Sequence, residues 1–263
     1  MRRVIGVFGG TGLYELLDRA RTVEVGTPYG APTAAFTVGE VGGVEAAFLP
    51  RHGTEHQFPP HTINYRANLW GMKELGVDRI IGPCAAGSLV PEFRPGDLVV
   101  PDQLVDRTWG RPATFYDGPE TAHVSFADPY CAELRPLALE ACRTAGSAVH
   151  DGGTTVVIQG PRFSTRAESR WFALAGFQVI NMTQLPEALL ARELEICYVN
   201  IAVITDYDVG VEGQVEAVTH QAVMERFART LGTVRQAVLA LIPEAAATPR
   251  ACECPRALSL ATG

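Results

Sequence analysis

Two aspartates stand two positions apart at the end of an apolar run. Asp206 and Asp208 close the segment 198–205, Tyr-Val-Asn-Ile-Ala-Val-Ile-Thr, which is typical of a buried strand. Ligands of parallel α/β sheets bind at the carboxyl ends of strands, where an unpartnered buried carboxylate would be costly. Either acid could therefore hold a proton for a reacting group of a bound ligand. The alternative is that both acids cap the next helix or lie in solvent.

A glycine turn follows the first apolar segment, residues 4–8. Its sequence is Gly9-Gly10-Thr11-Gly12, so backbone N–H groups and the Thr11 hydroxyl could cradle an anion. The dinucleotide fingerprint is excluded because Glu15 stands where its third glycine belongs, and no Gly-Lys-Ser/Thr follows as in a P-loop. An anion site and a plain turn remain the two interpretations.

A basic turn follows the second strand candidate, residues 44–49. Arg51 carries a planar fork of donors suited to phosphate, and His52 beside it could donate a further hydrogen bond. Glu55 and His56 suggest a metal site, but the spacing is not His-Glu-x-x-His. The turn is predicted to hold an anion, with a surface turn as the alternative.

Three further clusters follow predicted strands. Small residues at 82–89 leave room for a ligand against bare backbone, and Phe163 could stack on a flat base. Thr183 precedes a predicted helix, where it could cap the helix or help its N-terminus bind an anion. The clusters together predict one pocket for an anion, a sugar and a base.

Strand and helix patterns alternate along the chain and would position these clusters. The predicted strands are 4–8, 44–49, 79–82, 97–100, 154–159, 178–181 and 197–204. The predicted helices are 65–75, 129–145, 166–175, 185–194 and 216–241. The pattern predicts an α/β fold: a single domain over residues 1–243 with a mixed, twisted central sheet flanked by helices. Residues 244–263, rich in Ala, Pro and Thr, are predicted to form a flexible tail.

Composition limits the remaining possibilities. The 263 residues carry a net charge of -7, which gives no general attraction to nucleic acid or to an anionic membrane. No apolar run is long enough to span a bilayer and no secretory segment is recognised, so we expect a cytoplasmic protein. Four of the six cysteines stand in apolar contexts and are predicted to be core thiols; Cys252 and Cys254 make at most half a metal site.

The ordered motifs resemble the methylthioadenosine phosphorylases of the trimeric purine nucleoside phosphorylase family. The resemblance covers about residues 4–242 and rests on 9–12, 50–53, 64–68, 86–89, 95–97, 103–107, 160–168, 181–183 and 205–208. It implies that phosphate attacks the anomeric carbon of a 5'-substituted purine nucleoside, with no metal or organic cofactor. The partners implied are the nucleoside, phosphate and further copies of the chain, in a homotrimer or a dimer of trimers.

The resemblance also assigns the site. Phosphate would be surrounded by Thr11, Arg51, His52, Cys84, Ala85 and Thr183. The nucleoside would contact Phe163, Ser164, Met182, Asp206, Asp208, His220, Val223 and Met224, with His123 contributed by a neighbouring subunit. Asp206 is expected to be the general acid at purine N7, with Asp208 orienting it or binding the 6-amino group.

Three positions bear on specificity. Relatives specific for 6-oxopurines carry Glu and Asn where this chain has Ser164 and Asp206, which favours adenine. Methylthioadenosine-cleaving relatives often have Thr at Cys84, and a thiol is a weaker donor. His220 stands where relatives that accept a 5'-hydroxyl carry His, so it indicates tolerance of adenosine or is a surface residue.

Three other functions remain as alternatives. A 6-oxopurine or broad-specificity phosphorylase would use the same fold and phosphate site. A non-enzymatic nucleotide-binding module would rely on the glycine turn, and a hydrolase would have little use for Arg51 beside His52.

Overall fold

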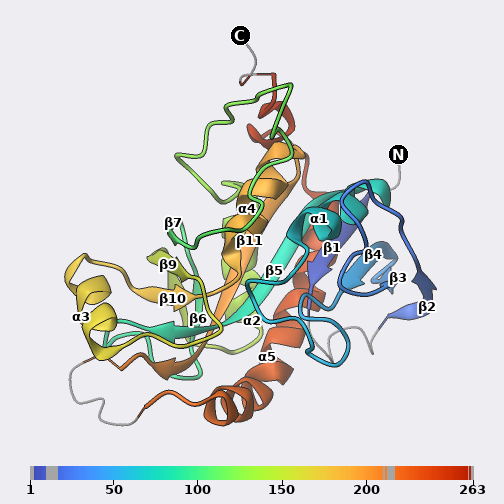
Figure 1. The fold of residues 1–263 in the computed structure, drawn as a ribbon. Helices are drawn as coiled ribbons and strands as arrows, with labels where there is room; N and C mark the ends of the chain where they lie inside the picture. Colours follow the sequence, from blue (N-terminus) through green and yellow to red (C-terminus); the bar gives the residue numbers. More distant parts are fainter. Residues whose placement is uncertain (1–2, 10–16, 210, 212–216, 260, 262–263) are drawn as a thin grey trace.

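The fold is organised around a mixed sheet whose centre is the strand pair β5–β11 (Figure 1). The computed structural model describes residues 3–9, 17–209, 211, 217–259 and 261. Within them the strands are β1 (Val4–Phe8), β2 (Asp18–Val23), β3 (Phe36–Val41), β4 (Val44–Leu49), β5 (Val77–Ser88), β6 (Leu98–Val100), β7 (Gln103–Arg107), β8 (Val149–Asp151), β9 (Thr154–Ile158), β10 (Val179–Asn181) and β11 (Cys197–Tyr207). The helices are α1 (Tyr65–Glu74), α2 (Leu134–Thr144), α3 (Arg166–Leu174), α4 (Gln184–Glu193), α5 (His220–Ala247) and a short 3-10 helix (Cys254–Arg256).

β5 is the strand on which the sheet branches. Its first part pairs parallel to β1, its last residues pair antiparallel to β10, and β11 runs parallel to it along its length. The sheet continues in the order β2-β3-β4-β1-β5-β10-β9-β7, while β6 and β8 extend from β11. This arrangement confirms the predicted single α/β domain with a mixed sheet.

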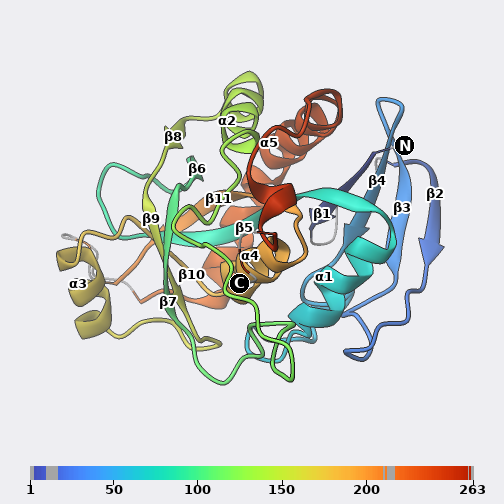
Figure 2. The ribbon, with the colours of Figure 1, turned by 90° about the horizontal axis from the view of Figure 1, so that it is seen from above.

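Helices cover both faces of the sheet. β1 shows how: Ile5 and Val7 pack in the cluster with α2 and α5, whereas Val4 and Phe8 pack in the cluster with α1 and α4. Successive side chains of a strand point to opposite faces, so a strand covered on both faces is apolar throughout. Figure 2 shows α2 beside α5 on one side of β11 and α1 on the other.

Local signals set several helix ends. Asn64 caps α1 by accepting the N–H of Ala67 at 3.2 Å. Thr165 and Glu168 form a reciprocal capping box at the start of α3. Gly76 follows α1 with a φ of 77°, a left-handed conformation that glycine adopts without strain.

The structure differs from the predicted elements mainly at the sheet edges. β2, β3, β7 and β8 were not predicted; β2 is a polar, exposed edge strand with no apolar alternation to reveal it. The two central strands are longer than predicted, since β5 reaches Ser88 and β11 reaches Tyr207. The predicted pocket residues at 82–88 and 205–207 therefore lie within paired strands.

The predicted flexible tail is corrected by the described residues that follow residue 243. α5 continues through Pro243 to Ala247, and Cys254 beyond it is only 3% exposed. Ala251 donates its N–H to Glu133 at 2.9 Å, and Arg250 donates to the carbonyl of Glu195 at 2.5 Å. Partners distant in the sequence thus order a segment whose composition alone suggested a loose end. Among the helices described, none combines the length and apolar character needed to cross a bilayer.

Candidate active site

Arg51 is a buried cation that follows β4. Its Nε and Nη2 donate to the two carboxylate oxygens of Glu187 at 2.6 and 2.7 Å, and Nη1 donates to the Pro83 carbonyl at 3.1 Å. Burial alone would lower the pKa of Arg51, but the carboxylate of Glu187 raises it above the ordinary value. Since a guanidinium has five N–H donors, these three bonds leave two for an anion.

His52 follows Arg51 and is held as a neutral ring. Its Nδ1 lies 2.9 Å from the carbonyl oxygen of Phe58, so Nδ1 carries the hydrogen and donates. Burial and the neighbouring Arg51 charge lower the pKa of His52 to about 4, although the hydrogen bond to Phe58 opposes them. Nε2 therefore offers a lone pair, which accepts a hydrogen bond. The sequence suggested that His52 donates to an anion, whereas in this geometry its Nδ1–H donates to Phe58.

Cys84 lies in the middle of β5 within a buried polar network. Its Sγ accepts from Asn181 and Asn200 amide nitrogens, each at 3.3 Å, and lies 3.9 Å from Gln184 Nε2. Burial raises the pKa of Cys84, which keeps the thiol protonated at neutral pH. The sulfur is occupied as an acceptor, so only its weak S–H is left for a phosphate oxygen. Ala85 follows on β5 and is partly exposed.

The junction between β10 and α4 brings further predicted residues to the same region. Thr183 is the N-cap residue of α4, yet its side chain makes no capping hydrogen bond. Its hydroxyl is therefore not committed to the helix. Leu185 has extended backbone angles (φ -119°, ψ 133°), so the regular part of α4 begins only after it. Met182 precedes Thr183 and packs so closely on Gly160 that a Cβ there would lie 2.6 Å from the Met182 sulfur. Thr11 lies outside the described residues.

Asp206 is placed by an irregularity in the β5–β11 pairing. The register shifts between Ile204 and Asp206, and Asp206 then pairs with Gly87 of β5. Burial raises the pKa of Asp206 to about 6, while the hydroxyl of Thr205, 2.8 Å from Oδ2, lowers it. A Cβ at position 87 would lie 3.1 Å from Asp206 Oδ1, so the absent side chain leaves room for this carboxyl.

Asp208 is more deeply buried than Asp206, at 3% exposure. Burial raises the pKa of Asp208 as well. Its Oδ2 and the Ser164 hydroxyl oxygen are buried without a hydrogen-bond partner among the described residues. Buried polar atoms are rarely left unpartnered, and a ligand with donors is one way to satisfy them.

The contacts of Arg51 and Asp206 with β5 allow the distance between these two groups to be estimated. The Arg51 guanidinium is anchored at Pro83, and Asp206 lies beside Gly87, four residues further along the strand. At about 3.3 Å per residue, that is roughly 13 Å between the two anchors, before either side chain reaches inward. The interval accommodates an anion, a pentose and a flat base.

Phe163 and Ser164 lie on the loop between β9 and α3. The capping box fixes the end of this loop, and Arg162 clamps it by two bonds of 2.7 Å to Glu168. Phe163 and Ser164 are both partly exposed as residues, although the hydroxyl oxygen of Ser164 itself is buried.

The first turns of α5 approach the phosphate side of the site. The His56 ring stacks on His52 with centroids 4.4 Å apart, and His220 lies 5.9 Å from His56. His220 is therefore connected to the predicted site through ring contacts, although it is solvent-exposed. Val223 and Met224 follow on the same helix, partly exposed and 42% exposed respectively.

His123 is not brought to this site by its own chain. It lies on the long segment between β7 and α2, and its N–H donates to the Ala261 carbonyl at 3.4 Å. That segment runs beside the C-terminal end of the chain, at the opposite side of the molecule from the start of α5 (Figure 1).

Sequence reasoning missed the groups that support the site. Glu187, which is 1% exposed, also accepts from the Tyr198 hydroxyl at 2.7 Å. Asn200 joins the Cys84 network and donates to the Gly82 carbonyl at 2.5 Å. A signal existed for each, since Glu187 is the one polar residue in the apolar stretch 185–191 and Asn200 interrupts an apolar strand pattern.

The chain is similar in sequence and fold to known phosphorylases. The Phosphorylase superfamily profile matches residues 4–242. The S-methyl-5'-thioadenosine phosphorylase of Mycolicibacterium smegmatis is 59% identical over 80% of this chain and 79% of its own length. The purine nucleoside phosphorylase of Streptomyces coelicolor is 50% identical over 97% of this chain and 94% of its own. A methylthioadenosine phosphorylase from an antarctic soil metagenomic library superposes with a TM-score of 0.94 at 37% identity, covering 99% of this chain and 92% of that one. The chain thus belongs to the phosphorylase superfamily, in the family that contains the methylthioadenosine phosphorylases and their purine nucleoside phosphorylase relatives.

Proposed function

We propose that the protein cleaves 5'-methylthioadenosine with inorganic phosphate, giving adenine and 5-methylthioribose 1-phosphate. The observation that carries the proposal is that two groups lie beside the same strand, β5: the buried Arg51 cation at Pro83 and Asp206, an acid whose pKa is raised to about 6, at Gly87. The name of the Mycolicibacterium smegmatis relative supports the same substrate. The enzyme is then a pentosyltransferase.

Phosphate is proposed to bind between Arg51, His52 and Thr183. The two remaining Arg51 N–H donors would hold its oxygens, and the neutral Nε2 of His52 would accept from a protonated phosphate oxygen. Thr183, Ala85 and Cys84 complete this set of phosphate-binding residues, with the uncommitted Thr183 hydroxyl as a donor. Thr11 is proposed as a further donor on the basis of its motif.

Charge develops on both sides of the breaking bond. The sugar gains positive charge in an oxocarbenium-like transition state, which a neighbouring phosphate dianion stabilises. The purine gains negative charge, which a proton from Asp206 to N7 neutralises. At pH 7 a carboxyl with a pKa of about 6 is protonated in roughly a tenth of molecules, far more than an ordinary aspartic acid. Asp208 is proposed to orient Asp206 or to accept from the 6-amino group.

Base and sugar contacts follow from the loops around the acid. Phe163 is proposed to pack on the purine and Met182 on the ribose, with Ser164 and Asp208 at the 6-amino edge. The unpartnered Asp208 Oδ2 is an acceptor, which suits an exocyclic NH2 and repels a carbonyl oxygen. Adenine is therefore favoured over hypoxanthine or guanine.

A broader purine nucleoside phosphorylase is the second candidate. The observation that favours it is His220, whose ring lies 5.9 Å from that of His56, beside the residues proposed to bind phosphate. The His220 ring could donate to a 5'-hydroxyl. The Streptomyces coelicolor relative is named a purine nucleoside phosphorylase. Val223 and Met224 keep an apolar surface that suits a methylthio group.

The oligomer and the setting are also proposed. His123 lies apart from its own chain's site, which supports a homotrimer, alone or in pairs, in which a neighbour supplies this residue. The proposed chemistry uses phosphate as a co-substrate and asks for no metal or organic cofactor in the reaction. We propose that the protein works in the cytoplasm.

The test is incubation of the purified protein with methylthioadenosine, with and without phosphate, followed by an assay for free adenine. Phosphate-dependent release of adenine is expected. Release without phosphate would make the protein a hydrolase. No release, together with turnover of inosine or methylthioinosine, would establish a 6-oxopurine phosphorylase and overturn the assignment of Asp208.

A further inference from the structure

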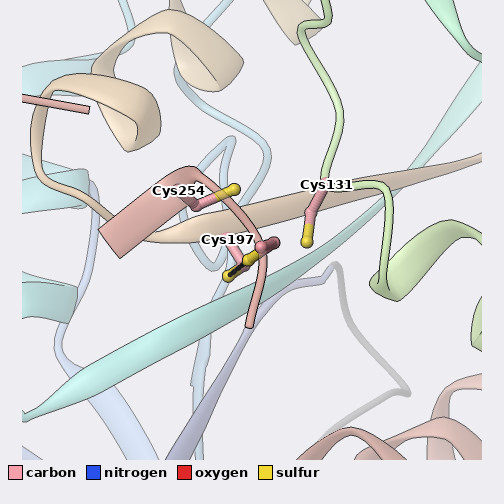
Figure 3. Close-up of side chains that lie close together, drawn as sticks. Cys131, Cys197 and Cys254 are labelled. Atoms are coloured by element: carbon pink, nitrogen blue, oxygen red, sulfur yellow. Dashed lines mark hydrogen bonds between the residues drawn. The ribbon is translucent and has the colours of Figure 1, made fainter. Parts of the chain in front are cut away.

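Four cysteines from separate parts of the sequence meet at the N-terminal end of β11. Cys131 precedes α2, Cys197 begins β11, and Cys252 and Cys254 follow α5. Their sulfur atoms all lie within 4.8 Å of one another, and Cys197 Sγ is 3.5 Å from Cys252 Sγ. Figure 3 shows Cys131, Cys197 and Cys254 close together on three separate segments. The fold thus supplies the two thiols that the Cys252–Cys254 motif lacked.

The spacing suits one metal ion. With zinc–sulfur bonds of about 2.3 Å, the sulfurs of a tetrahedral four-thiolate site are roughly 3.8 Å apart. The cluster is within about an ångström of that arrangement before any ion is bound. Cys131, Cys197 and Cys254 are at most 3% exposed, so water would not compete strongly for the ion.

The charges around the cluster give a second, independent indication. Zinc with four thiolates carries a net charge of -2, which is costly to bury without nearby cations. Arg79 is 1% exposed and is the β5 partner of Cys197 in the strand pairing. Its Nε and Nη1 are buried without an acceptor among the described residues, and Arg250 Nε is in the same condition. Arg250 already pairs with the Asp78 carboxylate at 3.5 Å through Nη1. A buried anionic centre would offset the charge of Arg79, and its sulfurs would accept from the unpartnered N–H groups of both arginines.

The segment that carries Cys252 and Cys254 is already positioned. Arg79 Nη2 donates to the Thr248 carbonyl at 2.8 Å, and Leu258 N–H donates to Glu195 at 3.2 Å. Together with the Ala251–Glu133 bond, these contacts hold both ends of the segment on the body of the protein. Little rearrangement is needed to close the cluster around an ion.

We propose that Cys131, Cys197, Cys252 and Cys254 bind one zinc ion in a structural tetrathiolate site. On binding, each thiol gives up its proton and each sulfur forms a bond to zinc. The ion fixes the end of the chain to the start of β11 and to the segment before α2. The ion lies away from the residues proposed to bind phosphate and purine, and it takes no part in the phosphorolysis.

The test is the metal content of tag-free protein purified without chelators under reducing conditions. Elemental analysis should find one zinc ion per chain in the wild type and in Cys142→Ala, which removes a buried thiol outside the cluster. Cys252→Ser and Cys254→Ser should each lose the zinc. Cobalt exchanged into the wild type should show intense thiolate charge-transfer absorption, and removing the metal should lower Tm in the wild type while leaving Cys254→Ser unchanged.

Thiol counting and intact mass provide the opposite outcomes. A native protein without zinc that is two hydrogens lighter for each disulfide would show that the thiols pair covalently and would overturn the proposal. Four free thiols that bind neither added zinc nor cobalt would also overturn it. So would a full zinc content in both serine variants, because the ion would then be bound elsewhere.

Discussion

The carboxylate of Glu187 holds the guanidinium of Arg51 through two hydrogen bonds of 2.6 and 2.7 Å, across 136 positions of sequence. Both residues are almost completely buried. The pair keeps Arg51 charged where burial alone would lower its pKa, and it fixes the plane of the two N–H donors that remain. Arg51 is therefore a charged and oriented hydrogen-bond donor that can bind an anion inside the protein.

Glu187→Gln should weaken phosphate binding more than it changes turnover at saturating phosphate. The variant leaves the Arg51 charge buried with a neutral partner, and breaking a buried ion pair costs about 3 to 5 kcal/mol. Phosphate KM and urea unfolding report the two effects. Glu193→Gln is the matched control: Glu193 is buried in the same helix but bonds Thr114 and Phe115, so stability should fall without a change in phosphate KM. Equal phosphate KM values in the two variants would refute the role of Glu187.

Asp206→Asn should reduce kcat for methylthioadenosine roughly 100- to 10,000-fold, because the amide cannot protonate purine N7. Phosphate binding, measured by calorimetry, should change little. Asp97→Asn is the control, since Asp97 lies beside β11 but pairs with His150 at 2.7 Å. If Asp206→Asn turned over methylthioadenosine at the wild-type rate, Asp206 would not be the general acid.

The raised pKa of Asp206 should make stability depend on pH. The ordinary value of 3.8 is raised to about 6, so below pH 4 both the folded and the unfolded states hold the proton. Between pH 4 and 6 the unfolded state loses it first, and the folded state loses up to about 3 kcal/mol of relative stability. The unfolding free energy of the wild type should therefore fall relative to that of Asp206→Asn as the pH rises from 4 to 6. The difference should level off above pH 6. A constant difference from pH 4 to 7 would mean that the carboxyl is not perturbed.

His220→Ala should discriminate between substrates that differ at the 5' position. The loss of one hydrogen bond of about 1 to 1.5 kcal/mol should lower kcat/KM for adenosine roughly tenfold. Methylthioadenosine, which offers no 5'-hydroxyl, should be unaffected. Gln221→Ala, an exposed neighbour on the same helix turn, should change neither value. Parallel losses for both nucleosides in His220→Ala would contradict a role in 5' specificity.

A shared site should permit complementation between inactive subunits. His123→Ala co-expressed with Asp206→Asn should regain activity, because some sites of a mixed trimer combine an intact Asp206 with a neighbour's intact His123. Arg51→Ala with Asp206→Asn should not recover, since both residues belong to one chain's site. The assay is phosphorolysis by the purified mixed oligomer, whose mass is checked by light scattering. Failure of the first pair to recover, with trimers present, would exclude a shared pocket.

Much of the site could be predicted because its residues carry local signals. Arg51, Thr183 and Asp206 each follow or end a strand with a clear apolar pattern. Parallel pairing brings the ends of β4 and β11 to one edge of the sheet, whereas β10, which precedes Thr183, runs antiparallel to β5. The strand positions were less accurate at the edges: β2 is exposed and polar, so no burial pattern marks it. The protonation of His52 was also beyond local reasoning, because it depends on the carbonyl of Phe58 and on burial.

The sequence by itself determined the alternation of strands and helices, the phosphorylase motifs and the twin aspartates, since all of these depend on neighbouring residues. The tertiary structure decided which distant residues meet. It paired Arg51 with Glu187, surrounded Cys84 with three amides, and gathered Cys131 and Cys197 with the two cysteines of the terminal segment. The physical reason is that burial and partner distances, which set charge states and possible ligands, depend on how the elements pack in three dimensions.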